Sequence, residues 1–292
     1  MTWTAADWGT SNLRVWRMEG ARPVQQATSD QGMGRLAPEE FEPALREAAP
    51  WLAEGERVVV CGMAGAKQGW REAPYATVPC PPGGGDPVQV PAQGLRVHIL
   101  PGLKQPSPAD VMRGEETQIA GFLALSPEFD GVLCLPGTHT KWVQVSAGEV
   151  VSFRTVMTGE LFALLSRQSV LRHSVTSDSW DDATFEDALS DGLSRPEALA
   201  ARLFGIRAEG LLNGQEAATG KARLSGLLIG AELAATRPYW LGQRIGLIGA
   251  SGLSGLYARA LASQGAPTGT MDAEQATLAG LTAAWRRLEG TA

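Results

Sequence analysis

The feature that most constrains this chain is a pair of apolar strands, each ending in a glycine–threonine turn. The first is DWGTSNLR, residues 7–14, and the second is LPGTHTKW, residues 135–142. Alternating polarity around each turn predicts two strands joined by a tight connection. The two pairs lie in different halves of the 292-residue chain. We therefore expect an α/β fold that is duplicated, with two lobes and a central cleft.

Composition and charge exclude several classes of protein. Hydrophobic residues make up 44% of the chain and charged residues 19%, which is typical of a globular protein. The net charge of −6, without a run of Lys or Arg, argues against a nucleic-acid or membrane-surface partner. No uninterrupted apolar run predicts a membrane span, and the first residues do not resemble a signal peptide. Cys61, Cys80 and Cys134 lack metal-ligand spacing, so we expect a protein of the reducing cytoplasm.

Periodicity and turn residues give a coarse order of elements along the rest of the chain. Strands are expected at 24–28, 57–61 and 244–250, and the segments 71–80 and 101–108 look like loops. The last helix is expected to begin at Asp272, where D-A-E-Q has the form of a capping box. The other expected helices are 38–53, 115–125, 159–169, 182–190, 195–212, 216–236 and 254–263.

Both strand–turn motifs offer groups that suit phosphate. In the first, the carboxylate of Asp7 stands beside backbone N–H groups and short hydroxyls, a combination that can bind an anion and hold Mg²⁺ through water. The second offers Gly137, Thr138 and Thr140, with His139 and Lys141 added. Each motif alone is also compatible with an ordinary polar hairpin, but a duplicated phosphate clamp needs both.

Two further motifs carry candidate chemistry. LIGASGLSGLYARAL, residues 247–261, predicts a strand, a glycine-rich turn and a helix, where a nucleoside could lie against the helix N-terminus. This turn is neither GxGxxG nor a P-loop, and a tight turn without a ligand is its alternative. RGEETQIAG places Glu115 and Glu116 at a helix start, where acidic residues are also ordinary partners of the helix dipole.

These residues together resemble a known family. AADWGTSNLR, CGMAGAKQGWREAPY, PGLKQ, DVMRGEETQIAG, LPGTHTKWV, MTGELFALL, GLLIGAEL and LIGASGL are similar to the 2-dehydro-3-deoxygalactonokinase family, in the same order and over nearly the whole chain. That family belongs to the acetate and sugar kinase/Hsc70/actin superfamily. The resemblance implies two ribonuclease-H-like lobes, residues 1–114 and 115–271, with the last helix, 272–292, crossing back to the first lobe.

The resemblance also implies an ATP- and Mg²⁺-dependent kinase. Its reaction would phosphorylate the 6-hydroxyl of 2-dehydro-3-deoxy-D-galactonate in D-galactonate breakdown, with closure of the lobes around the ligands. Asp7 would hold the metal ion. The implied ATP-binding residues are Gly9, Thr10, Ser11, Gly137, Thr138, His139, Thr140, Gly249, Ala250, Ser251 and Gly252.

Catalysis needs a carboxylate that accepts the proton of the attacking hydroxyl. GEETQIAG resembles a segment of related kinases that carries an Asp, and it places Glu115 at that position. Glu116 and Asp110 are rivals, and Glu160 is a more distant one. The substrate's carboxylate and ketone call for cations and hydrogen-bond donors. Its candidate contacts are Arg14, Lys67, Gln68, Trp70, Lys104 and Arg113.

Alternatives remain open at this point. One is a phosphohydrolase of the exopolyphosphatase type, which the lack of clustered cations disfavours. Another is a sugar-sensing member of the superfamily, which would need a DNA-binding domain or a damaged Asp7. The sequence does not distinguish the galactonate-derived acid from its gluconate-derived epimer. It also leaves the oligomeric state open, a homodimer being one option.

Overall fold

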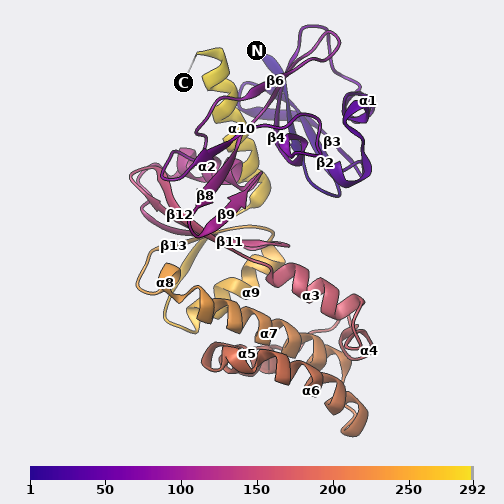
Figure 1. The fold of residues 1–292 in the computed structure, drawn as a ribbon, viewed down its shortest axis with the longest axis vertical. Coiled ribbons are helices and arrows are strands. Elements are labelled where there is room, and N and C mark those ends of the chain that lie inside the picture. Colours follow the sequence, from indigo (N-terminus) through magenta and orange to yellow (C-terminus); the bar gives the residue numbers. More distant parts are fainter. Residues whose placement is uncertain (291–292) are drawn as a thin grey trace. The chain divides into compact units, whose positions relative to one another are not determined.

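A computed structural model describes residues 1–290, which divide into two compact units (Figure 1). The N-terminal unit contains residues 1–130, 145–153 and the chain from 271 onward, and the C-terminal unit contains 131–144 and 154–270. We had expected the first lobe to end at residue 114, but the helix that follows lies in the N-terminal unit. Residues 291 and 292 of the expected 272–292 segment lie outside the described chain.

A six-stranded sheet forms the centre of the N-terminal unit. Its strand order is β3-β2-β1-β4-β7-β6, with β1 antiparallel to β2 and parallel to β4. Alternate residues of β1 face opposite sides, as the period of a strand requires. The strands are β1 (Thr2–Trp8), β2 (Leu13–Glu19), β3 (Arg22–Ser29), β4 (Arg57–Gly62), β6 (Val88–Val90) and β7 (Arg96–Ile99).

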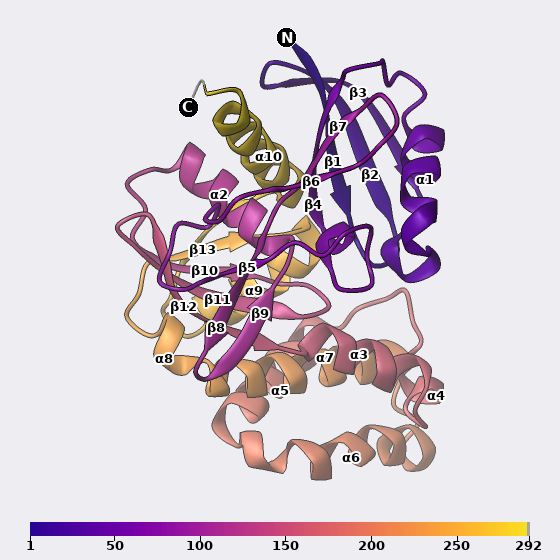
Figure 2. The ribbon, with the colours of Figure 1, turned by 45° about the horizontal axis from the view of Figure 1, so that its top comes forward.

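The two faces of this sheet carry separate apolar cores. Trp8 packs with Phe41 of α1 (Phe41–Ala48) on one face, and this helix is shorter than the expected 38–53. On the other face Trp3 of β1 stacks on Trp285 of α10 (Ala273–Glu289), with ring centroids 5.2 Å apart. Figure 2 shows α1 and α10 on opposite sides of the sheet. The last helix therefore completes the core that the first strand begins.

Helix α10 also packs closely against α2 (Glu115–Leu125). A Cβ added to Gly121 would lie 1.8 Å from the carbonyl oxygen of Ala276, so only glycine fits there. The expected start of α10 is confirmed, because the Asp272 side chain accepts hydrogen bonds from the backbone of Glu274 and Gln275.

A small sheet in the same unit corrects one expectation. Its order is β5-β8-β9, with strands Tyr75–Thr77, Gly102–Pro106 and Ala109–Met112. Residues 101–108, which we had expected to be a loop, mostly form β8 and its turn into β9. Pro101, Pro106 and Pro108 lie at or beside the ends of these strands.

The five-stranded sheet β12-β11-β10-β13-β14 supports the C-terminal unit, although most of β12 is assigned to the N-terminal unit. Strands β10 and β13 are parallel neighbours, with Leu133 opposite Gly246. The strands are β10 (Gly131–Leu135), β11 (Thr140–Ser146), β12 (Glu149–Val156), β13 (Ile245–Ile248) and β14 (Thr268–Met271).

Helices make up most of the rest of the C-terminal unit. Glycines at 192, 226 and 230 allow α5 and α7 to pack closely, since a Cβ at each would meet the backbone of the other helix within 2.5 Å. Within residues 1–290, no helix is long and apolar enough to cross a bilayer. The helices are α3 (Thr158–Arg167), α4 (Arg172–Val175), α5 (Asp182–Ser194), α6 (Leu199–Leu212), α7 (Ala217–Ala235), α8 (Arg237–Trp240) and α9 (Ser251–Ala262).

Candidate active site

The first glycine–threonine turn joins β1 to β2. A second glycine-containing segment, GMGR at residues 32–35, packs against it. Thr10 and Ser11 are exposed at the tip of the turn. The N–H of Gly34 donates to the carbonyl of Thr10 at 2.9 Å, and a Cβ on Gly32 would lie 2.3 Å from the backbone of Ser11. The GMGR segment therefore supports this turn.

Asp7, at the end of β1, lies in a group of charged and polar side chains. Its carboxylate forms an ion pair with Arg14, its antiparallel neighbour on β2, and its Oδ1 lies 3.7 Å from the Cys61 sulfur. Burial opposes the charge on Arg14, but the Asp7 carboxylate outweighs it and raises the pKa of Arg14. Arg14, a candidate substrate contact, is therefore at least partly committed to neutralising Asp7.

The two glutamates at the start of α2 occupy different environments. Glu116 is 2% exposed, and its Oε2 accepts the N–H of Gly114 at 2.7 Å. Burial, with a smaller contribution from the charge of Glu115, raises the pKa of Glu116 to about 8. Glu115 is half-buried, and its Oε2 accepts the backbone N–H of Arg113 at 3.1 Å. At neutral pH the carboxyl of Glu116 is therefore mainly protonated.

These glutamates lie close to the first turn because α2 begins beside the end of β4. A Cβ on Gly114, which has φ of +108°, would lie 3.4 Å from the Cα of Gly62. Cys61 is buried, and its pKa is raised first by burial and then by the charges of Asp7 and Glu116. One end of the six-stranded sheet therefore brings together the carboxylates that we had singled out from two distant motifs.

The rivals for the proton-accepting role lie elsewhere. Asp110 is on β9, and its Oδ1 accepts the N–H of Val111 at 2.8 Å. Glu160 is on α3, where its Oε2 lies 2.6 Å from Nε2 of His139.

The candidate substrate contacts fall into two groups. Lys67, Gln68 and Lys104 are exposed, so they are accessible to a ligand. Trp70 instead stacks on Phe41, with ring centroids 6.1 Å apart, and belongs largely to the core.

Arg113 is half-buried and lies over the Tyr75 ring, 4.2 Å from its centroid. Its Nη2 donates to the carbonyl of Ala73 at 2.8 Å. Its Nη1 is buried without a hydrogen-bond partner in the described chain, close to Gly65.

The second glycine–threonine turn follows β10 and contacts the start of α3. A Cβ on Gly159 would lie 2.2 Å from the carbonyl oxygen of Gly137, so glycine is required for this approach. Thr138 and His139 are exposed, whereas Thr140 is buried with its hydroxyl 3.1 Å from that of Tyr257. We had expected Thr140 to contact phosphate; the structure places its side chain behind the turn.

The turn after β13 lies beside the second glycine–threonine turn because the two strands are parallel neighbours. A Cβ on Gly249 would lie 3.5 Å from the carbonyl oxygen of Pro136. Ala250 is the N-cap of α9 and provides no side-chain cap, so the first N–H groups of the helix keep their capacity to donate. A Cβ on Gly252 would meet nothing within 4 Å, which leaves open space at this turn.

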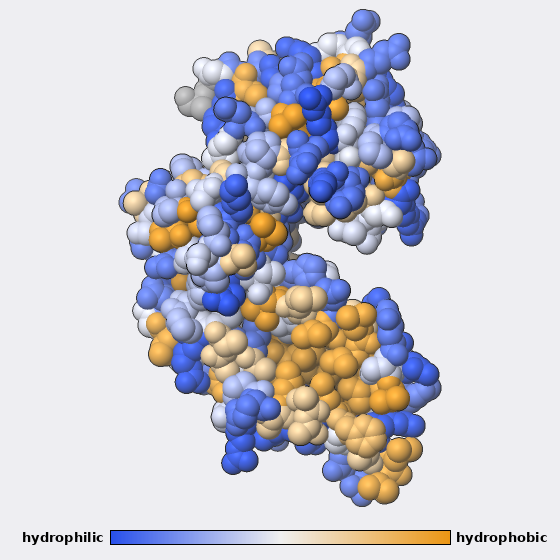
Figure 3. Space-filling view, in the orientation of Figure 1, coloured by the Kyte–Doolittle hydropathy of each residue, from blue (hydrophilic) through white to orange (hydrophobic). Residues whose placement is uncertain are grey.

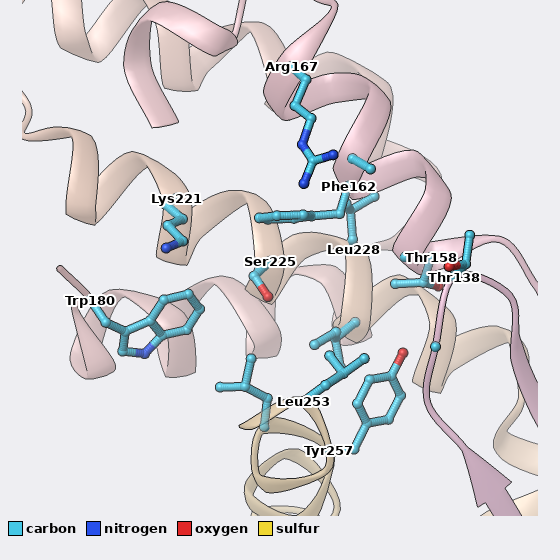
Figure 4. Close-up of a pocket in the computed structure, with 15 residues that line it drawn as sticks. Thr138, Thr158, Phe162, Arg167, Trp180, Lys221, Ser225, Leu228, Leu253 and Tyr257 are labelled. Carbon is cyan, nitrogen blue, oxygen red and sulfur yellow. The ribbon is translucent and has the colours of Figure 1, made fainter. Parts of the chain in front are cut away.

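A pocket of about 460 Å³ in the C-terminal unit begins at the second turn (Figure 4). Thr138 and Thr158 mark one end, and Trp180 and Lys221 the other. Its volume and apolar walls are typical of a site for a small organic ligand. The sequence analysis missed its walls because their residues come from three helices and look like ordinary core positions. These include Phe162 of α3, Ser225 and Leu228 of α7, and Leu253 and Leu256 of α9.

Exposed apolar side chains also gather outside this pocket, on the part of the C-terminal unit that carries α3 and α6 (Figure 3). On α3 these side chains are the N-cap residue Met157 and, within the helix, Leu161 and Leu164. On α6 they include Phe204 and Leu212.

The fold and the two turns define the class of protein, that of the two-lobed, actin-like ATPase fold. The chain belongs to the 2-keto-3-deoxy-galactonokinase family, which it matches over residues 7–284. The predicted family, fold class and kinase activity are thereby confirmed.

Similar proteins agree with this assignment. A 2-dehydro-3-deoxygalactonokinase of Escherichia coli (strain K12) is 36% identical over 282 residues, covering 95% of each chain. A solved structure of a Sinorhizobium meliloti protein, provisionally named a 2-dehydro-3-deoxygalactonokinase, has 39% identity and a TM-score of 0.90, with 98% of this chain and 96% of that chain covered. The ADPNP-bound activator of 2-hydroxyisocaproyl-CoA dehydratase from Clostridium difficile, at 12% identity, 100% and 97% coverage and a TM-score of 0.52, shares the fold.

Proposed function

We propose that this chain transfers the γ-phosphoryl group of Mg·ATP to the 6-hydroxyl of 2-dehydro-3-deoxy-D-galactonate, as a step of D-galactonate breakdown. The observation that carries the proposal is the match to the kinase family across the chain, together with the carboxylates of Asp7, Glu115 and Glu116 at one end of a sheet. Phosphoryl transfer mainly requires positioned groups and neutralised charge, and these elements provide both.

In the proposed reaction, the 6-hydroxyl oxygen forms a bond to the γ-phosphorus while the bond to the β,γ-bridging oxygen breaks. Glu115 accepts the proton of the hydroxyl. We prefer it to Glu116 because Glu116 is mainly protonated at neutral pH and therefore cannot accept a proton. Thr10 and Ser11 are exposed at the first turn, where they are available to donate to phosphate oxygens.

The residues at the first turn also fit Mg²⁺. Among residues 1–290 no three His, Cys, Asp or Glu side chains form a ready-made metal cage. Mg²⁺ does not need one, since it usually keeps several waters and binds through one or two carboxylates and the substrate phosphates. Asp7 provides such a carboxylate at the edge of the turn. The metal ion, when bound, would neutralise charge on the transferred phosphoryl group.

The pocket of the C-terminal unit is the proposed site of the adenosine. It begins at Gly137 and Thr138, which would face the phosphates, and its apolar walls suit a flat base. The helix start at Ser251, whose first N–H groups have no side-chain cap, would lie against the ribose or the α-phosphate. Lys67, Gln68, Lys104 and Arg14 remain proposed contacts of the sugar acid.

The test is release of ADP from purified protein with Mg·ATP and, separately, each of the two epimeric 2-keto-3-deoxy acids. ³¹P NMR of the product would identify the phosphorylated hydroxyl. We expect turnover with the galactonate epimer that falls roughly 10²–10⁴-fold in Glu115→Gln, the usual contribution of a placed general base. Asp7→Asn should raise the Mg²⁺ concentration that half-maximal turnover requires. Glu128→Gln, which changes an exposed carboxylate after α2, is the matched control.

Three results would contradict the proposal. Absence of sugar-acid-dependent ADP release would overturn the reaction. Faster turnover of the gluconate-derived epimer would overturn the substrate. Near wild-type turnover in Glu115→Gln would overturn its role as the proton acceptor.

A further inference from the structure

We infer that Glu232 is a positioning residue for phosphoryl transfer, which holds the second glycine–threonine turn in place through Tyr257 and Thr158. The inference rests on the proposed function of that turn. It concerns a buried carboxylate on α7 that belongs to none of the motifs with candidate chemistry.

Glu232 is 2% exposed, yet it is surrounded by hydrogen-bond donors. Its Oε1 accepts the indole N–H of Trp142 at 2.8 Å, and its Oε2 accepts the hydroxyl of Tyr257 at 2.7 Å. The Thr158 hydroxyl also donates to it. A buried carboxylate is costly unless it is paired or hydrogen-bonded, so these three donors are what stabilise it. They come from β11, α9 and α3, and the carboxylate therefore ties three elements to α7.

The first connection leads to the exit of the turn. Tyr257 has one hydroxyl proton, and it is donated to Glu232. Thr140 must then donate its own proton to the Tyr257 oxygen, which lies 3.1 Å away. The result is a chain of hydrogen bonds with one direction, from Thr140 through Tyr257 to Glu232. It fixes both the position and the hydroxyl orientation of the residue at which the turn becomes β11.

The second connection leads to the middle of the turn. Thr158 is the first residue of α3, and the next two residues of that helix contact the turn directly. Gly159 packs against the carbonyl of Gly137, and the N–H of Glu160 donates to the carbonyl of Thr138 at 2.9 Å. Holding Thr158 therefore holds the helix start that supports Thr138. Figure 4 shows Thr138, Thr158 and the hydroxyl of Tyr257 at the same end of the pocket.

One carboxylate thus fixes the turn from two sides, although it does not line the pocket. Small displacements of groups that contact a transferring phosphoryl group reduce the rate strongly. We expect loss of Glu232 to act more on the phosphate end of the bound nucleotide than on the base, because its connections through Tyr257 and Thr158 lead to Thr140 and Thr138 of the turn.

The experiment compares four variants of the full chain. Tyr257→Phe removes the hydroxyl between Thr140 and Glu232 and keeps the ring that lines the pocket. Glu232→Gln keeps the shape of the side chain but presents an amide nitrogen that can donate to the Tyr257 hydroxyl. This reverses the direction of the hydrogen bonds between Thr140, Tyr257 and residue 232. Trp142→Phe removes a donor to the same carboxylate without breaking the connection to Thr140. Ile206→Val changes a buried residue of α6 in a different apolar cluster and reports general destabilisation.

Two measurements are made on each variant: kcat and KM with the sugar acid, and affinity for AMP-PNP compared with affinity for adenosine. In Tyr257→Phe and Glu232→Gln we expect kcat to fall roughly 10- to 100-fold with little change in KM for the sugar acid. The preference for AMP-PNP over adenosine should also fall. The double variant should lose little more than either single one, because both act on one connection. Trp142→Phe and Ile206→Val should keep most of kcat and the preference.

Unchanged kcat and an unchanged preference for AMP-PNP in Tyr257→Phe and Glu232→Gln would overturn the inference. So would an equal loss of AMP-PNP and adenosine affinity in all four variants, which is the result of destabilisation alone. If the wild-type protein binds AMP-PNP but phosphorylates neither acid, the proposed reaction fails. Loss of the preference for AMP-PNP over adenosine in Tyr257→Phe and Glu232→Gln would then still support the role of Glu232 at the turn.

Discussion

At the scale of single residues, the clearest consequence of burial concerns Glu116. Its carboxyl is almost inaccessible and is bonded to the backbone N–H of Gly114 and to the Thr117 hydroxyl. The sequence places Glu115 and Glu116 at a helix start, and we preferred Glu115 over Glu116 only through the family resemblance. Only the packing of α2 against its neighbours distinguishes a half-buried glutamate from a buried one, and this packing depends on residues far away in the sequence.

A pH-dependent difference in stability follows for Glu116→Gln. Burial raises the pKa of Glu116 to about 8 in the folded chain, above its unfolded value. The folded state therefore binds more protons between the two pKa values, and the free energy of unfolding of the wild type falls as the pH rises through that range. The neutral amide avoids this loss, so the variant should be the more stable at pH 8.5, by on the order of a few kcal/mol.

Thermal unfolding of both proteins at pH 5.5 and pH 8.5 checks this prediction. The melting temperatures should be closest at the lower pH. A constant difference across the range would show that Glu116 does not change protonation on unfolding. Glu128→Gln, at an exposed position, should show no such trend.

At the scale of elements, the strands around the two turns and the helices at 115–125 and 216–236 could be predicted from pattern alone. The two helices are rich in apolar and small residues, and many of those residues are buried. The β8–β9 hairpin could not be predicted, since prolines at its ends obscured a short strand. The pocket walls could not either, because Phe162, Ser225 and Leu253 come together only through helix packing.

The packing of α2 on α10 gives a prediction at the same scale. A Cβ on Gly280 would lie 1.9 Å from the carbonyl oxygen of Thr117, so Gly280→Ala must push the two helices apart. We expect it to lower the free energy of unfolding by about 1–3 kcal/mol, the usual cost of overpacking. Gly205→Ala is the control, because it lies inside α6 with nothing within 4 Å of the added Cβ.

The control Gly205→Ala should instead raise the free energy of unfolding. Replacing an open helical glycine with alanine favours the helix, by up to about 1 kcal/mol. Chemical denaturation of both variants measures the two effects. An unchanged midpoint for Gly280→Ala would mean that α10 can move away from α2 without loss.

At the scale of the whole molecule, each unit has its own apolar cores and its own share of the proposed chemistry. The carboxylates and the first turn belong to the N-terminal unit, and the pocket and the second turn to the C-terminal unit. The duplicated motifs predicted two lobes. The boundary was harder to place, since the chain returns to the N-terminal unit at 145–153 and again after 270. The return of the last helix agrees with what the family resemblance implied, whereas the return at 145–153 was not expected, because it depends on long-range strand pairing that local patterns do not show.

This division predicts how ligands protect the chain from hydrogen exchange. Adenosine alone should slow exchange in α3, α7 and α9, whose residues line the pocket, and leave β1 and β2 unchanged. The extra stability at 100 times the dissociation constant is about 2.7 kcal/mol, which slows exchange measurably where opening is limiting. Protection centred on β1 and β2 instead would place the nucleoside in the other unit. Guanosine at equal concentration tests selectivity for the base.

The stacking of Trp3 on Trp285 also has a consequence for synthesis of the chain. The first strand leaves the ribosome long before the helix that covers its second face has been made. One side of the N-terminal sheet must therefore wait, with its apolar surface uncovered, until α10 has been translated. A nascent chain of this protein would be a natural client for chaperones at the ribosomal exit, and premature stop codons before residue 273 would leave a product that cannot bury that surface.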